Sequence, residues 1–71
     1  GESMMNEDVV NMEIRKFLKK VGITSQREIE KALQEAEAAG RLDNGTLKAS
    51  MKLEISDLGL EHVVEGEIAV E

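Results

Sequence analysis

Apolar residues recur with a helical period near the start of the chain, and this predicts a first helix. Five of them, which fall within about 100° of one another at 3.6 residues per turn, are Val10, Ile14, Phe17, Leu18 and Val21. Asn6 or Asp8 can cap this helix, because either side chain can accept a hydrogen bond from a free amide of the first turn. Gly22 is predicted to end it.

A second start signal follows directly. Ser25 and Glu28 fit a capping box, and Thr24 is the alternative cap. The apolar stripe of this second predicted helix is narrow and consists mostly of small residues, namely Ile29, Ala32, Leu33, Ala36 and Ala39. Gly40 is predicted to end the helix in the left-handed conformation.

The period then changes from 3.6 to 2, which predicts a β-hairpin. Residues 43–45 (Asp-Asn-Gly) give a turn signal, and apolar and polar residues alternate from Leu47 to Ile55. Residues 56–60 are expected to form the loop, and the returning strand runs from His62 to Val70. Strands of this kind have one apolar face and one face in water.

Matching the apolar faces of the two strands sets their register. Leu53 is expected opposite Val64, which also places Lys52 opposite Glu65 on the wet face. We therefore predict an α+β fold with order ααββ, in which two consecutive helices pack on one face of an antiparallel β-hairpin. Residues 5–71 are expected to form a single domain, and residues 1–4 a cloning remnant or a disordered N-terminus.

The chain has 71 residues without Cys, Trp, Tyr or Pro. For this mass, folding into an average globular protein would bury roughly 7,000 Å², about 60% of the extended surface. A core of this size is marginal without disulfides or a metal, so self-association is an expected source of stability.

The net charge is -6, and its sign is unevenly distributed. Residues 54–71 contain six acids and no Lys or Arg, which argues against nonspecific binding to nucleic acid. No apolar run approaches the length of a membrane span, and no leader pattern precedes the helices. A cytoplasmic location is therefore expected, with no membrane association.

No catalytic device can be identified in the sequence. His62 is the only imidazole, and its neighbours Glu61, Val63 and Glu65 belong to the other face of a regular strand. There is no Cys nucleophile, no glycine-rich phosphate loop and no spacing typical of a metal site. We predict that the chain is not an enzyme and that it has no catalytic residues, cofactor or metal.

The expected function is a non-catalytic interaction module that self-associates as a homodimer or binds another protein. A lone two-stranded sheet is marginal and leaves two unpaired edges, either of which could pair with a partner. The candidate interaction residues combine an apolar pair and a basic face on the first helix with charged positions on the two strands: Val9, Met12, Arg15, Lys16, Lys19, Lys20, Lys48, Lys52, Glu65 and Glu67. For Val9 and Met12 the alternative is cover by N-terminal residues, and for the basic face it is a merely solvated helix surface.

A second interpretation concerns nucleic acid. Residues 22–25, the apolar stripe that follows them, and the hairpin resemble the recognition-helix and wing segment of winged helix-turn-helix repressors. That resemblance implies DNA reading, but a wing carrying Glu61, Glu65 and Glu67 would meet phosphate unfavourably. Nucleic-acid binding is therefore kept only as the alternative function.

The chain as a whole also resembles a family of short bacterial proteins of unknown function. The segments that carry this resemblance are Met5–Asp8, Asn11–Met12, Ile14–Gly22, Thr24–Glu30 and Gly59–Ile68. The resemblance implies a small, bacterial, cytosolic, single-domain protein, and it supplies no functional residues.

Overall fold

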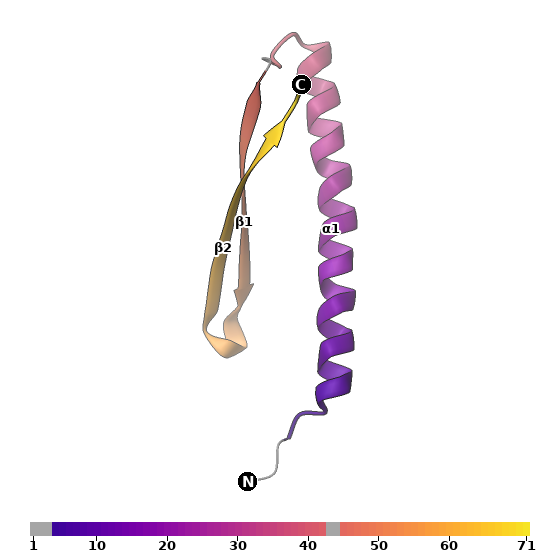
Figure 1. The fold of residues 1–71 in the computed structure, drawn as a ribbon, viewed down its shortest axis with the longest axis vertical. Helices are drawn as coiled ribbons and strands as arrows, with labels where there is room; N and C mark the ends of the chain where they lie inside the picture. The colour runs from indigo at the N-terminus through magenta and orange to yellow at the C-terminus, as the bar shows by residue number, and fades with distance from the viewer. Residues whose placement is uncertain (1–3, 43–44) are drawn as a thin grey trace.

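One long helix is followed by one β-hairpin in the computed structural model, which describes residues 4–42 and 45–71. Helix α1 spans Glu7–Ala38, strand β1 spans Thr46–Ile55, a 3-10 turn (η1) spans Ser56–Leu58 and strand β2 spans Leu60–Ala69. The hairpin runs back alongside the helix, to which it is joined at one end (Figure 1). The first two residues of the predicted turn at 43–45 lie outside the described residues.

The prediction of two consecutive helices is wrong, because α1 continues through the expected break. Gly22 lies inside the helix, and Ser25 does not begin a new one. Thr24, the alternative cap, instead donates from Oγ1 to the carbonyl oxygen of Lys20 at 2.7 Å, a bond within the helix. The fold is therefore α+β with a single helix and an antiparallel hairpin.

The two apolar stripes predicted for separate helices lie in phase on one helix. At about 100° per residue, the positions from Val10 to Ala36 fall within a common arc of about 160°. A glycine inside a helix costs only about 1 kcal/mol relative to alanine. Continuing the helix keeps every hydrogen bond and one continuous apolar face, so Gly22 does not suffice to end it.

The predicted ends of the helical region are confirmed. Asn6 caps α1, and its side-chain Oδ1 accepts a hydrogen bond from the Val9 amide at 3.2 Å. At the other end Gly40 has a φ of 67°, and its amide donates to the carbonyl oxygen of Glu37 at 3.0 Å. Only glycine adopts this left-handed conformation without steric cost, which explains why the helix ends here.

The hairpin keeps the predicted faces but not the predicted register. Leu53 pairs with His62 rather than with Val64, and Lys52 pairs with Val63 rather than with Glu65. The cause is a shorter loop: the 3-10 turn and Gly59, with a φ of 62°, return the chain within four residues. The strands then pair two residues earlier, which moves every partner but leaves each side chain on its expected face.

The chain is elongated, with principal extents of 59 × 19 × 19 Å and a radius of gyration of 17.2 Å. A globular domain of this length has a radius of gyration of about 11 Å. The accessible surface is 6705 Å², whereas about 4,400 Å² is typical for this mass. Folding as an isolated chain therefore buries about 40% of the extended surface, not the predicted 60%.

The core expected between the helices and the hairpin is not closed in the isolated chain. Among residues 4–42 and 45–71, no side chain is buried, whether apolar or polar. Val64, which was expected to lie under the helices, is 54% exposed. The reason is that α1 and the hairpin face each other across a hollow of about 700 Å³ instead of packing together.

Candidate interaction surface

A hollow of about 700 Å³ lies between α1 and the hairpin. Its walls are the stripe of α1 near its C-terminal end, the residues after the helix, and the inner face of both strands. The apolar residues that line it are Ile29, Ala32, Leu33, Ala36, Leu42, Leu47, Ala49, Met51, Val64 and Ile68. The lining also includes Gly66 and four charged or polar residues, namely Arg41, Lys48, Ser50 and Glu65. We call these two facing apolar surfaces the inner faces.

The inner face of α1 extends beyond this hollow toward the N-terminus. Ile14, Phe17 and Leu18 lie on the same stripe, and each remains about half exposed. A 32-residue helix is about 48 Å long, whereas a ten-residue strand spans about 34 Å. The strands are therefore shorter than α1, and the N-terminal end of the helix extends past the hairpin loop (Figure 1).

The basic residues predicted on the first helix do gather on one side of α1. Arg15, Lys16 and Lys19 line a shallow hollow of about 450 Å³ with Asp8, Asn11 and Met12. Lys16 also forms an ion pair with Glu13, with Nζ and Oε1 3.5 Å apart and both side chains well exposed. An exposed ion pair of this spacing stabilises a helix by only a few tenths of a kcal/mol.

The apolar pair on the outer side of α1 is exposed. Val9 is 47% and Met12 54% accessible, although residues 4 and 5 precede them in the described chain. Cover by the described N-terminal residues is therefore not observed. Lys20, the fourth member of the basic set, is exposed on the same helix.

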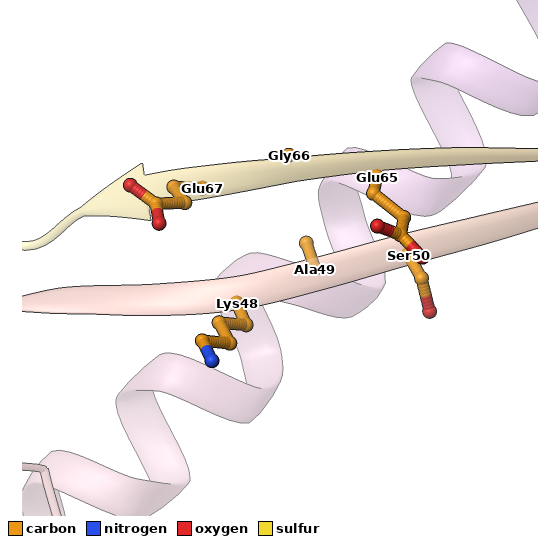
Figure 2. Close-up of a pocket in the computed structure, with 6 residues that line it drawn as sticks. All are labelled: Lys48, Ala49, Ser50, Glu65, Gly66 and Glu67. Carbon is orange, nitrogen blue, oxygen red and sulfur yellow. The ribbon is translucent and has the colours of Figure 1, made fainter.

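The charged residues predicted on the strands share the outer face of the hairpin. Lys48, Ser50, Glu65 and Glu67 surround Ala49 and Gly66 in a shallow hollow of about 490 Å³. Figure 2 shows the Lys48 ammonium directed away from the carboxylate of Glu67, although these residues are Cα partners. The hollow is open, and nothing in it brings a charged group against a second one.

Lys52 does not meet Glu65, because the register differs from the prediction. Its Nζ lies 3.3 Å from Oε1 of Glu54, two residues further along β1. Both side chains are more than half exposed. This pair is thus a surface contact within one strand, and its net contribution to stability is small.

His62 lies on the inner face of β2, opposite Leu53, and it is exposed. Within the described part of the chain, no group of three or more His, Asp or Glu side chains could hold a metal ion. The predictions that the chain is not an enzyme and has no cofactor remain predictions.

The sequence identified the charged outer positions but missed the inner faces as the functional candidate. The apolar residues that form them were assigned to a closed core, with Leu33 and Val64 as members. The phase of the two stripes was a signal of this uncovered apolar surface. On one helix the stripes cover an arc of about 160°, which is wider than the roughly 100° of one packed face.

This chain is a small α+β protein. It consists of one long helix and one hairpin, and the apolar faces of both are uncovered. No helix among the described residues is long and apolar enough to cross a membrane, and the cytoplasmic location stays a prediction. The chain belongs to the DUF6494 family, a family of unknown function whose model matches residues 5–71. This confirms the resemblance to a family without an assigned activity. No curated protein and no solved structure matches the chain.

Proposed function

We propose that this chain is a non-catalytic interaction module that binds another protein chain through its inner faces. One observation carries the proposal: half-exposed apolar side chains line both inner faces, and none of the described residues is buried. Large exposed apolar patches on soluble proteins mark interaction sites.

The distribution of charge supports the same function. Apolar residues predominate in the lining of the hollow, which also includes Arg41, Lys48, Ser50 and Glu65. Protein interfaces likewise combine a largely apolar centre with a smaller number of polar groups. The outer hollows, in contrast, are lined mostly by charged and polar residues.

No specific observation favours the nucleic-acid alternative. The winged-helix resemblance required a turn before a second helix, and residues 22–25 are helical. The net charge of -6 also opposes a polyanionic partner. Nucleic-acid binding is therefore not part of the proposal.

Two adjacent valines provide a matched test. Val64 is 54% and Val63 51% exposed, but they point to opposite faces of β2. In the isolated chain, Val64→Asp and Val63→Asp should therefore have nearly equal effects. A partner on the inner face breaks this equality, because a carboxylate buried there loses its hydration.

In the first measurement, the tagged full chain captures binding proteins from a lysate of the native cell, and untagged copies of the chain itself count among them. The second measurement is the mass of each purified variant in solution. We expect Val64→Asp to lose the captured protein and Val63→Asp to keep it. Equal capture by both variants, or a monomeric wild type that captures nothing, would refute the proposed function. Far-UV circular dichroism of both variants controls for loss of the fold.

A further inference from the structure

We propose, on the basis of the proposed function, that the partner is a second copy of this chain. In this dimer the β1 strands of the two copies pair antiparallel, edge to edge, and the two hairpins become one four-stranded sheet. The two α1 helices lie side by side over the apolar face of that sheet. Area, hydrogen-bond direction and charge support this arrangement independently.

The exposed area matches the needs of an obligate dimer. The isolated chain exposes 6705 Å², about 2,300 Å² more than the average for its mass. Two copies would have to bury about 6,200 Å² in total to reach the average for a protein of twice the mass. Obligate homodimers bury 2,000 to 5,000 Å² or more, so the deficit is of the size that a second copy supplies.

The free edge of β1 carries a regular row of unpaired backbone groups. The Val70 amide donates to the Gly45 carbonyl oxygen at 2.8 Å, which marks this pair as a hydrogen-bonded one. Hydrogen-bonded and non-hydrogen-bonded pairs alternate in an antiparallel ladder. The backbone groups of odd residues of β1 therefore bond to β2, and those of even residues point to the free edge of β1. Ser50, in the middle of β1, therefore directs its backbone N–H and C=O to the free edge.

Charge distinguishes the β1 edge from the β2 edge. Antiparallel pairing of two β1 strands around Met51 places Lys48 opposite Glu54 of the second copy, twice in the dimer. Both residues lie on the outer face, and the apolar odd residues of β1 then meet on the inner face. On β2, the outer face carries Glu61, Glu65 and Glu67. If two β2 strands paired antiparallel around a residue near the middle of the strand, a carboxylate of one copy would lie opposite a carboxylate of the other, which is destabilising.

The charge along α1 favours the same two-fold arrangement. Residues 7–22 of α1 contain four bases and three acids, a net charge of +1, whereas residues 23–38 contain two bases and four acids, a net charge of -2. Antiparallel helices bring the basic half of one copy beside the acidic half of the other, and parallel helices would place the bases together. The wide apolar arc of α1 can then contact both its own hairpin and the neighbouring helix.

The first test uses proline at two residues that are Cα partners. Ser50 and Glu65 lie opposite each other in the hairpin, and the alternation directs their N–H groups to opposite edges. Proline is tolerated where the N–H faces out from an edge strand, but it removes the donor and blocks pairing there. By sedimentation velocity at micromolar concentration, we expect a two-chain mass for the wild type and for Glu65→Pro, and a one-chain mass for Ser50→Pro.

The second test uses charge and does not depend on proline. Glu54→Lys turns two attractive cross-copy pairs into repulsive ones and should weaken dimerisation about tenfold or more. The double variant Lys48→Glu/Glu54→Lys restores opposite charges across the edge, although it does not restore the Lys52–Glu54 contact within β1. It should therefore recover the dissociation constant of the wild type to within about threefold, and Glu65→Lys should leave it unchanged.

Each outcome decides between the alternatives. A dimeric Ser50→Pro variant, or a charge swap that fails to rescue Glu54→Lys, would overturn pairing through β1. Loss of the dimer in Glu65→Pro alone would assign the contact to β2 instead. A wild type that is monomeric at high micromolar concentration would overturn the inference but leave the proposed function standing, provided that Val64→Asp still loses a captured protein and Val63→Asp keeps it.

Discussion

Substitution of Gly22 by alanine tests the central difference between the sequence-based expectation and the structure. If Gly22 lies inside one continuous helix, alanine removes a residue of poor helix propensity and should stabilise the fold. If Gly22 ends a first helix in the left-handed conformation, alanine should destabilise it. The sign of the change therefore separates one helix from two.

The magnitude follows from the local geometry of Gly22. Its φ is negative, and nothing lies within 4 Å of a Cβ atom built at this position. Alanine therefore brings no steric penalty within the chain, and the gain is about 1 kcal/mol from helix propensity and the less flexible unfolded chain. For a domain of this size, that corresponds to an increase of about 4 to 8 °C in the melting temperature.

Gly40→Ala is the matched control, because both glycines are open to a Cβ and they differ in backbone conformation. Gly40 has a φ of 67°, and beyond it the Arg41 amide donates to the Ala36 carbonyl oxygen at 2.8 Å. Alanine there should cost about 1 to 2 kcal/mol. Thermal unfolding followed by far-UV circular dichroism, at one protein concentration for all variants, measures both changes.

The result that would refute the continuous helix is a Gly22→Ala variant with a lower melting temperature and a weaker helical signal. Equal losses for Gly22→Ala and Gly40→Ala would point the same way, because both glycines would then act as helix ends. A gain for Gly22→Ala and a loss for Gly40→Ala would confirm the reasoning.

Three further substitutions test the local features that define the elements. Asn6→Ala removes the acceptor for the Val9 amide and should cost about 1 kcal/mol in urea unfolding; an unchanged midpoint would show that Asn6 does not cap the helix. Gly59→Ala forces a side chain into a φ of 62° and should cost about 1 to 2 kcal/mol, with Gly59→Asn less damaging by melting temperature. Glu13→Gln breaks the exposed pair with Lys16 and should change the free energy of unfolding by less than about 0.5 kcal/mol at moderate salt; a larger loss would contradict its assignment as a solvated contact.

Local signals in the sequence predicted the boundaries of the fold well. Asn6 and Gly40 mark the two ends of the helical region, because each satisfies a backbone requirement that few other residues meet. The alternation of residues 47–55 placed every strand side chain on its correct face. Both kinds of signal act within a few residues, so they do not depend on the rest of the molecule.

The errors in helix number and strand register arose where a local signal competed with a longer-range one. Gly22 and Ser25 have the chemistry of a helix end and a helix start, but the stripes on either side share one phase, and a continuous helix satisfies both. In the hairpin, matching apolar faces fixes the register only to within two residues. The length of the loop decided the rest, because the 3-10 turn and the left-handed Gly59 make the strands pair two residues earlier than expected.

The position of the candidate site could not be predicted from the pattern, because a pattern shows which residues avoid water and not which chain covers them. Leu33 and Val64 read equally well as members of an internal core or of an interface. Length adds the missing constraint: a helix of about 48 Å over a hairpin of about 34 Å leaves part of its stripe without cover from its own chain.

This mismatch links folding to association. If the apolar faces of α1 and the hairpin become buried only when a second copy arrives, the free energy that stabilises the fold is largely the free energy of dimerisation. The melting temperature of the wild type should then rise with protein concentration, and that of Ser50→Pro should not. The apolar stripe of α1 would in that case serve the partner as much as the fold of its own chain.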